Sequence, residues 1–159
     1  MDNKTNLYYQ VKSGSGTNSA RSYTVSIYNN SDSVLKVAGS SNSSGQWSDN
    51  GAPTEIGIGT WGSFTCESHG FCTGAEGSVV YKIDKLTPTD PTTVTFNFAV
   101  PYWGSNSASW TVDRAGSGYY FDPATSPNDG KSGIDNASDS VTFGGASPSP
   151  GGTYGGNID

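Results

Sequence analysis

The sequence of 159 residues has little charge and few basic side chains. Charged residues make up 14% of the chain, and its eight lysines and arginines are scattered rather than clustered. The formal net charge of −6 repels a phosphate backbone, which argues against nucleic acid as a partner. It also argues against simple electrostatic attraction to anionic lipid. Recognition of a membrane would have to depend on neutral or zwitterionic headgroups and on inserted aromatic side chains.

Groups that carry catalysis are also scarce. Histidine occurs once, as His69 in a Ser-His-Gly-Phe turn, without the nucleophile and orienting acid that a catalytic base needs. No Gly-x-Ser-x-Gly elbow is present, and residues 130–132 (Gly-Lys-Ser) lack the first glycine and the flanking elements of a phosphate-binding loop. The fourteen acidic residues mostly fall in turns. These absences predict a protein that is not an enzyme and has no cofactor.

Long hydrophobic runs are missing. The longest apolar run extends from Phe98 to Trp103 and is interrupted by Pro101, far short of the roughly 20 residues that span a bilayer as a helix. The first six residues have no apolar core and do not form a signal peptide. We therefore expect a protein that is secreted or extracellular without an evident signal peptide, in a soluble form able to associate with membranes.

Cysteine occurs only at Cys66 and Cys72. Their spacing is compatible with a small-loop disulfide and also with two thiols in adjacent turns, because spacing does not show the geometry that a bridge needs. A zinc site made of Cys66, His69 and Cys72 would lack the fourth ligand of structural zinc. The oxygen-rich segment from Asn128 to Asp139 departs from EF-hand spacing and is better explained as an Asx-rich loop than as a calcium site. No metal site is predicted.

Glycine and aromatic residues are abundant, with 22 glycines and 12% aromatic side chains. Apolar and polar residues alternate in short runs separated by turn formers, which is typical of half-buried strands. Residues 21–37 are predicted to form a β-hairpin that turns at 29–33. The other expected strands lie around residues 64, 78–84, 93–100, 110–112, 119–121 and 140–143.

No stretch of ten or more residues has helical spacing. The sequence therefore predicts an all-β fold, an antiparallel β-sandwich or a partly closed barrel, over residues 21–145. A polar N-terminal leader at 1–20 precedes this domain, and a Gly/Pro/Ser-rich tail at 146–159 follows it.

Four tryptophans lie in or beside predicted loops: Trp47, Trp61, Trp103 and Trp110. One or two of them are expected in the core. Tyr102 and Trp103 stand in a turn bounded by Pro101 and Gly104, from which a ring does not easily reach a core. Exposed amphipathic rings at one end of a sandwich suit either the face of a sugar or the headgroup level of a bilayer.

Three segments, in this order, resemble the aegerolysin family. Residues 21–31 (Arg-Ser-Tyr-Thr-Val-Ser-Ile-Tyr-Asn-Asn-Ser) are similar to the opening strand and turn of that family. Residues 74–79 (Gly-Ala-Glu-Gly-Ser-Val) are similar to its Gly-Thr-Glu-Gly segment. Residues 94–106 resemble its aromatic strand, which ends in a Pro-aromatic-Gly-Ser turn. The match covers roughly residues 21–112, most of the predicted domain.

This resemblance implies a small β-sandwich akin to the actinoporins that binds membrane lipids, often sphingolipids. Some members form pores together with a larger partner protein, and some bacterial relatives are insecticidal. For this chain it implies a cytolysin-like or toxin component with a lipid-headgroup site on the loops that carry Trp47, Tyr102, Trp103 and Trp110. Two other hypotheses remain open. One is a lectin-like module that stacks sugars on Trp103; the other is a structural or matrix protein without a small ligand, which burial of all four tryptophans would favour.

Overall fold

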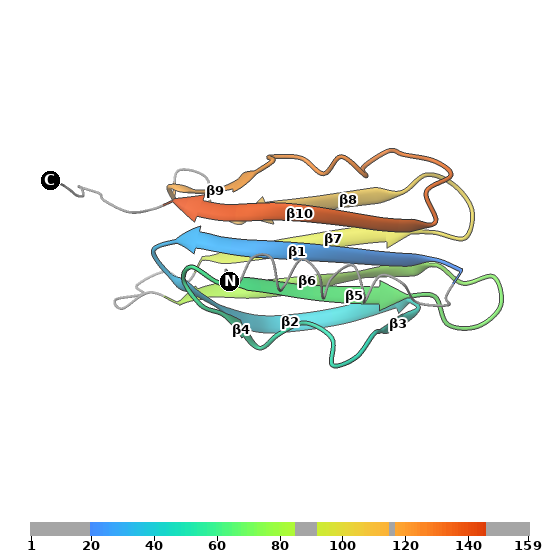
Figure 1. Cartoon of the computed structure of the whole chain (residues 1–159), viewed down its shortest axis with the longest axis horizontal. Helices are drawn as coiled ribbons and strands as arrows, with labels where there is room; N and C mark the ends of the chain where they lie inside the picture. The colour runs from blue at the N-terminus through green and yellow to red at the C-terminus, as the bar shows by residue number, and fades with distance from the viewer. Residues whose placement is uncertain (1–19, 85–91, 115–116, 146–159) are drawn as a thin grey trace, which may run out of the picture.

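A computed structural model describes residues 20–84, 92–114 and 117–145 (Figure 1). The predicted tail at 146–159 and all but the last residue of the predicted leader lie outside these described residues. Regular structure within the described part is entirely β, and no helix there is long and apolar enough to cross a membrane. The strands are β1 (Ser22–Ser31), β2 (Val34–Ser44), β3 (Gln46–Trp47), β4 (Glu55–Ile56), β5 (Trp61–Glu67), β6 (Ala75–Asp84), β7 (Thr93–Val100), β8 (Ser107–Val112), β9 (Tyr119–Asp122) and β10 (Asn136–Gly145).

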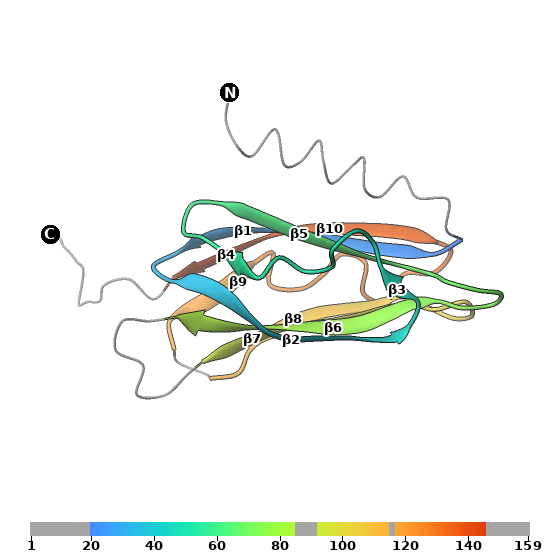
Figure 2. The same cartoon turned by 90° about the horizontal axis from the view of Figure 1, so that it is seen from below.

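The strands form two five-stranded sheets, and Figure 2 shows the two layers packed face to face. One sheet has the order β3-β5-β1-β10-β9, and the other has the order β4-β2-β6-β7-β8. Paired strands are antiparallel except β1 and β10, which run parallel. The predicted all-β sandwich is confirmed, with one parallel pair between the first and last strands of the described chain.

Alternation of side chains along the strands builds the core between the two sheets. In β7 the apolar residues Val94, Phe96, Phe98 and Val100 are all buried, as the period of two predicts. Phe98 stacks on Tyr23 of β1 in the opposite sheet, with ring centroids 4.9 Å apart and an interplanar angle of 13°. Such aromatic pairs contribute about 0.5–1.5 kcal/mol beyond the burial of their area. β7, which has the clearest alternation in the sequence, therefore packs against the opposite sheet through its apolar face.

The predicted hairpin over residues 21–37 is wrong. β1 pairs with β5 and β10 in one sheet, whereas β2 pairs with β4 and β6 in the other. The buried Asn29 side chain stabilises this change of sheet, because its amide nitrogen donates hydrogen bonds to Ser33 O (2.8 Å) and to Ile56 O (2.9 Å) in β4. The turn-forming residues are used for a crossover between sheets.

One carboxylate, that of Asp139 in β10, is buried between the sheets. It accepts hydrogen bonds from Tyr23 Oη (2.7 Å), Ser126 Oγ (2.6 Å) and Asn128 Nδ2 (2.7 Å). These donors compensate the carboxylate for its lost hydration. Burial, followed by the charge of Asp139, raises the pKa of Tyr23 well above its ordinary value. Part of the predicted Asx-rich segment thus serves to hold the β9–β10 connection against the sandwich.

Candidate functional site

Several connections meet at the end of the sandwich where β5 and β7 finish and where β1, β6, β8 and β10 begin, at the right of Figure 1. We call this end the tip and define it as residues 68–74, 101–106 and 131–135 together with Arg21. Two of its segments lie in close contact: a Cβ atom added at Gly74 would lie 2.8 Å from Pro101 Cα. The tip brings together residues that are far apart in the sequence.

Large apolar side chains project into solvent from the tip. Phe71 is 92% exposed, Trp103 is 80% exposed and Ile134 is 42% exposed. Single exposed apolar residues are ordinary on protein surfaces, but several of them at one end, with polar neighbours, are typical of a binding surface. The tip therefore has the character of a docking surface for something apolar or amphiphilic.

Tyr102 is held in place by Arg21, and Trp103 packs against Tyr102. The guanidinium carbon of Arg21 lies 4.7 Å from the centroid of the Tyr102 ring, and its Nη2 donates a hydrogen bond to Tyr102 O (3.2 Å). Arg21 Nε also lies 3.6 Å from the carboxylate of Asp135. The Trp103 ring meets the Tyr102 ring edge to face, with centroids 4.8 Å apart. Arg21 is thus engaged within the protein, and the tip presents its rings without a free arginine beside them.

Phe71 is presented by a tight loop between β5 and β6. Gly70 and Cys72, on either side of it, have φ angles of 96° and 59°, in the left-handed region. Thr73 closes the loop, because its Oγ1 lies within hydrogen-bond distance of His69 N (3.0 Å) and His69 O (2.9 Å). This geometry holds the Phe71 ring away from the core. Phe71 was not among the predicted site residues, although an aromatic residue directly after a glycine in a short polar loop was a usable signal.

The loop of Phe71 and the loop of Trp103 are also joined through side chains. A hydrogen bond with the Cys72 side chain, followed by the charge of that group, raises the pKa of Tyr102. Cys72 therefore lies beside the phenol of Tyr102. Because Phe71 precedes Cys72 and Trp103 follows Tyr102, this contact links the two loops that carry the exposed rings.

The third segment of the tip is fixed by Asn106, which is buried. Its backbone nitrogen donates to Lys131 O (2.7 Å), and its side-chain amide donates to Ile134 O (2.9 Å). Ser105 Oγ also lies 3.0 Å from Ser132 Oγ. These bonds bring Ile134 to the same end as Trp103 and hold the connection before β10 in one conformation.

Two of the predicted lipid-binding tryptophans do not belong to the tip. Trp110 is 5% exposed, and its Nε1 donates a hydrogen bond to Pro123 O (3.0 Å), so the prediction that it forms part of an exposed rim is wrong. Trp47 is half-buried and packs edge-on against Phe64 and Phe98, with centroids 5.7 and 5.9 Å apart. Both rings stabilise the core, because each lies on a strand whose apolar face points inward.

The two cysteines are free thiols, so the disulfide alternative is wrong. Cys66 lies on the inward face of β5 and is fully buried, whereas Cys72 is exposed in the loop that follows. Burial raises the pKa of Cys66 to about 12, which keeps this thiol protonated and unreactive at neutral pH. Within the described residues, no three His, Cys, Asp or Glu side chains are grouped as a metal site requires.

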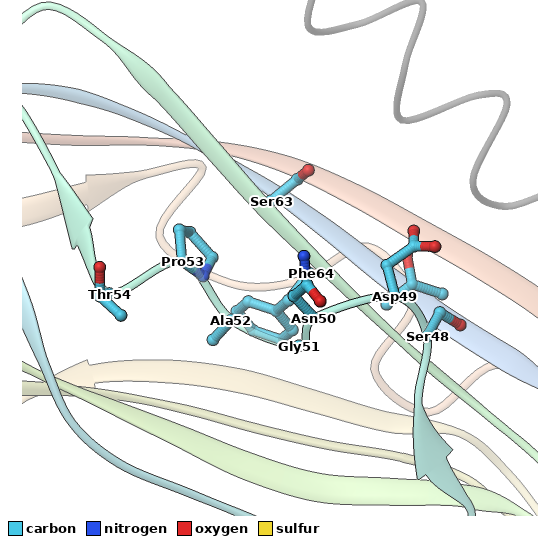
Figure 3. Close-up of a pocket in the computed structure, with 10 residues that line it drawn as sticks. Ser48, Asp49, Asn50, Gly51, Ala52, Pro53, Thr54, Ser63 and Phe64 are labelled. Atoms are coloured by element: carbon cyan, nitrogen blue, oxygen red, sulfur yellow. The ribbon is translucent and has the colours of Figure 1, made fainter.

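A separate depression of about 440 Å³ lies beside β5, under the connection between β3 and β4 (Figure 3). Its lining combines apolar and polar residues: Ser48, Asp49, Asn50, Gly51, Ala52, Pro53, Thr54, Ser63, Phe64 and Thr65. Figure 3 shows the Phe64 ring beneath the connection, while the polar groups of Asp49 and Ser63 project to the opposite side. We call this depression the β5 pocket.

Comparison with known proteins supports the fold. No protein-family profile matches the chain, and no curated protein matches it by sequence. Among solved structures, the crystal structure of the lipid binding protein Nakanori is similar, with a TM-score of 0.58 and 14% sequence identity. The match covers 89% of this chain and 78% of the Nakanori chain. At this identity the likeness shows a shared β-sandwich fold and nothing finer.

Proposed function

We propose that this protein is a membrane-lipid binding protein that docks through its tip and acts by binding, without catalysis. The observation that carries the proposal is the exposure of Phe71 (92%) and Trp103 (80%) on two connections held side by side. Tryptophan favours the headgroup level of a bilayer, because its indole N–H stays hydrated while the rest of the ring is buried, and the phenyl ring of Phe71 adds apolar area beside it. The lipid binding of Nakanori, whose fold is similar, agrees with this assignment.

The tip is large enough for measurable binding. Burial of one aromatic or aliphatic side chain contributes about 1.5–3 kcal/mol. Phe71, Trp103 and Ile134 together would contribute several kcal/mol, and part of this gain is lost through the immobilisation of the protein on the surface. Moderate, reversible binding is therefore expected, rather than permanent insertion.

Charge favours a neutral or zwitterionic surface. The chain has a formal net charge of −6, and Arg21 is engaged with Asp135 and with the Tyr102 ring. Anionic lipid would gain little from such a tip and would repel the protein as a whole. Binding should consequently change little with salt concentration, in contrast to binding driven by basic residues.

The finer part of the proposal comes from the resemblance to aegerolysins. We propose that the lipid is a sphingolipid, that the protein is a component of a cytolysin or toxin, and that pore formation would require a second, larger protein. It would act outside the cell that makes it. Of the alternatives, the structural protein without a small ligand would be favoured by burial of all four tryptophans, and the exposure of Trp103 does not meet that condition.

Liposome co-sedimentation across a lipid panel tests the proposal. Neutral vesicles with and without sphingolipid, and anionic vesicles, are compared at low and high salt. Trp103→Ser should weaken binding about tenfold or more, since about 1.4 kcal/mol corresponds to a factor of ten. Tyr120→Ser, which removes an exposed aromatic residue away from the tip, should bind as the unmodified protein does. Failure to bind any neutral vesicle, or equal binding of the two variants, would refute the tip as the docking surface.

A further inference from the structure

The outward side of β1 is buried, although it faces away from the core. Side chains alternate along this strand, and its apolar residues point into the sandwich. The residues between them, Ser22, Thr24 and Ser26, therefore point outward, yet each is at most 2% exposed. Thr65 of β5 pairs with Thr24 and is also buried. We call these four residues, together with the neighbouring Trp61 of β5, the β1 outer face.

Burial of this kind is not general among the outward positions of the sandwich. On the other sheet, Ser78 of the central strand β6 is half-buried and its partner Asn97 of β7 is exposed. Within the same sheet, Ser138 and Ser140 of β10 are exposed, although they pair directly with buried residues of β1. The cover over the β1 outer face therefore lies along β1 and β5 and ends before β10.

The described strands and connections do not provide this cover. They form two layers, and none of the described segments crosses the outside of the layer that holds β5, β1 and β10 (Figure 2). A small side chain that its own sheet leaves open is buried only by atoms that lie above the sheet. The exposures refer to a single chain, so we look for the cover within the same chain, outside the described residues.

The cover is apolar where it meets the β1 outer face. Ser26 Oγ and Trp61 Nε1 are both buried, and neither has a hydrogen-bond partner. These two groups lie close together, because Ser26 pairs with Ser63 and Trp61 pairs with Tyr28, one step further along the same two strands. Water or a polar group above them would bond to them. Their burial without a partner therefore indicates that hydrocarbon lies over them.

Residues 1–19 have the required chemistry and reach. They contain an apolar cluster at Leu7, Tyr8, Tyr9 and Val11, and they join the described chain at Ala20, directly before β1. The stretch from Val11 to Ala20 spans up to about 30 Å. Trp61, the far end of the β1 outer face, lies about 20 Å along the strand from the start of β1. The cluster can therefore return along β1 and cover the whole face.

The other segments outside the described residues fit less well. Residues 85–91 join β6 to β7, which both belong to the opposite sheet. Residues 146–159 follow β10, which runs parallel to β1, so they leave the sheet at the end opposite to Ala20. They are rich in Gly, Pro and Ser, and their large apolar side chains are only Tyr154 and Ile158.

We propose that the β1 outer face is an intramolecular docking surface for residues 1–19, which cover it with the apolar side chains of residues 7–11. The N-terminal segment is then part of the folded domain and not a polar leader. The β1 outer face contains none of the residues that define the tip. This proposal is therefore independent of membrane docking, and either one can fail while the other stands.

The test follows the exchange of indole N–H hydrogens with water by nuclear magnetic resonance in the isotope-labelled full chain. The Trp61 N–H should exchange slowly in the unmodified protein, since its Nε1 is buried. The triple variant Leu7→Ser, Tyr8→Ser, Val11→Ser should make this exchange faster by about tenfold or more, because water gains access to the face. Trp110, whose Nε1 is hydrogen-bonded in the core, reports on folding and should be unchanged.

Matched variants separate the candidate covers. The triple variant Asn3→Ser, Asn6→Ser, Gln10→Ser changes the same segment without removing apolar area, so Trp61 exchange should stay slow. The double variant Tyr154→Ser, Ile158→Ser changes the tail and should also leave it slow. Faster exchange in the tail variant alone assigns the cover to residues 146–159 and overturns the proposal.

Nuclear Overhauser contacts in the unmodified protein give a readout that does not depend on the folding of a variant. The methyl groups of Leu7 or Val11 should show contacts to the Thr24 methyl group or to the Trp61 ring. In a mixture of labelled and unlabelled chains, contacts between different copies would assign the cover to a second copy of the chain and overturn the proposal. Absence of these contacts, or Trp61 exchange that is unchanged in the apolar triple variant, would also overturn it.

Discussion

The two ends of the sandwich are built from the same kinds of residue and use them differently. We call the end opposite the tip the crossover end and define it as residues 29–33, 57–60 and 119. At the tip, loop residues leave large rings in solvent; at the crossover end, loop residues bury polar groups and bond them to one another. The comparison indicates that the exposed rings of the tip are not a general property of the loops of this fold.

Asn29 is the centre of the crossover end. Its side-chain nitrogen donates to Ser33 O and Ile56 O, and its Oδ1 accepts from Ser31 N (3.1 Å) and Ser31 Oγ (2.7 Å). Its backbone nitrogen donates to Thr60 O (2.9 Å). The whole hydrogen-bonding capacity of the amide is used inside the protein, so this end is specialised for stability, whereas the tip is available for binding.

Asn29→Ala gives the largest expected change and breaks the crossover end. Ile56 O and Ser31 N lose the Asn29 side chain as a partner in a buried environment, while Ser33 O and Ser31 Oγ keep the bond between them (3.0 Å). Each unsatisfied group costs about 1–3 kcal/mol. We expect the free energy of unfolding to fall by about 3–4 kcal/mol in urea titrations followed by tryptophan fluorescence. Asn30→Ala, at the exposed neighbouring position, is the matched control and should change stability by less than about 0.5 kcal/mol. Similar losses in both variants would contradict the role given to Asn29.

Phe71→Ser and Ile58→Ser each remove one exposed apolar residue, the first from the tip and the second from the crossover end. Ile58 is 54% exposed and lies at the crossover end. Phe71→Ser should lower the affinity for neutral vesicles by about 1–2 kcal/mol, the value of one ring partly buried at an interface. Ile58→Ser should leave vesicle affinity unchanged, and both variants should keep the melting temperature of the unmodified protein. An equal loss of binding in the two variants would show that docking does not prefer the tip.

The smallest expected effect is the response of the crossover end to alkaline pH. Burial, together with the Asp32 carboxylate that accepts a hydrogen bond from the phenol (2.7 Å), raises the pKa of Tyr119 to about 12. An unfolded tyrosine has a pKa near 10. The unfolded state therefore loses its proton first, and the stabilisation by Tyr119 is complete below about pH 10 and is lost as the pH rises through about 12.

Tyr119→Phe removes this titration from the folded protein. Its deficit in unfolding free energy relative to the unmodified protein should therefore shrink between about pH 9 and pH 11.5. Burial also raises the pKa values of Tyr23 and Tyr81. Both tyrosines are present in the variant and in the unmodified protein, so their contributions cancel when the two unfolding free energies are subtracted. Tyr120→Phe, at the exposed neighbouring position, is the control. A deficit for Tyr119→Phe that stays constant with pH would contradict the assignment.

Much of the fold could be predicted because strand formation is a local property. The alternation over 93–100 coincides with β7, and the run over 78–84 falls within β6. The pairing of strands could not be predicted in the same way. Residues 21–37 have the pattern of a hairpin, but the bonds from Asn29 to Ser33 and Ile56 favour a crossover, and the partners of β1 come from residues 61–67 and 136–145.

The candidate site was only partly predictable, for a related reason. Trp103 and Trp110 both lie near the β7–β8 turn, yet one is 80% exposed and the other is in the core. Their difference depends on strand register: Trp110 faces Phe96 across the β7–β8 ladder, while Trp103 precedes β8. Phe71 was missed because a ring in a short loop has no periodic neighbours to reveal the direction in which it points.

The fold class followed from the sequence alone. Period-two alternation is typical of strands wherever it occurs, and with one histidine, two cysteines and scattered basic residues the sequence offered few candidates for catalytic or phosphate-binding groups. The exposure of individual rings, the separation of Cys66 from Cys72 and the meeting of distant loops at one end became visible in the folded protein. Alternation depends on neighbouring residues in the chain, whereas exposure depends on which strands and loops pack against them.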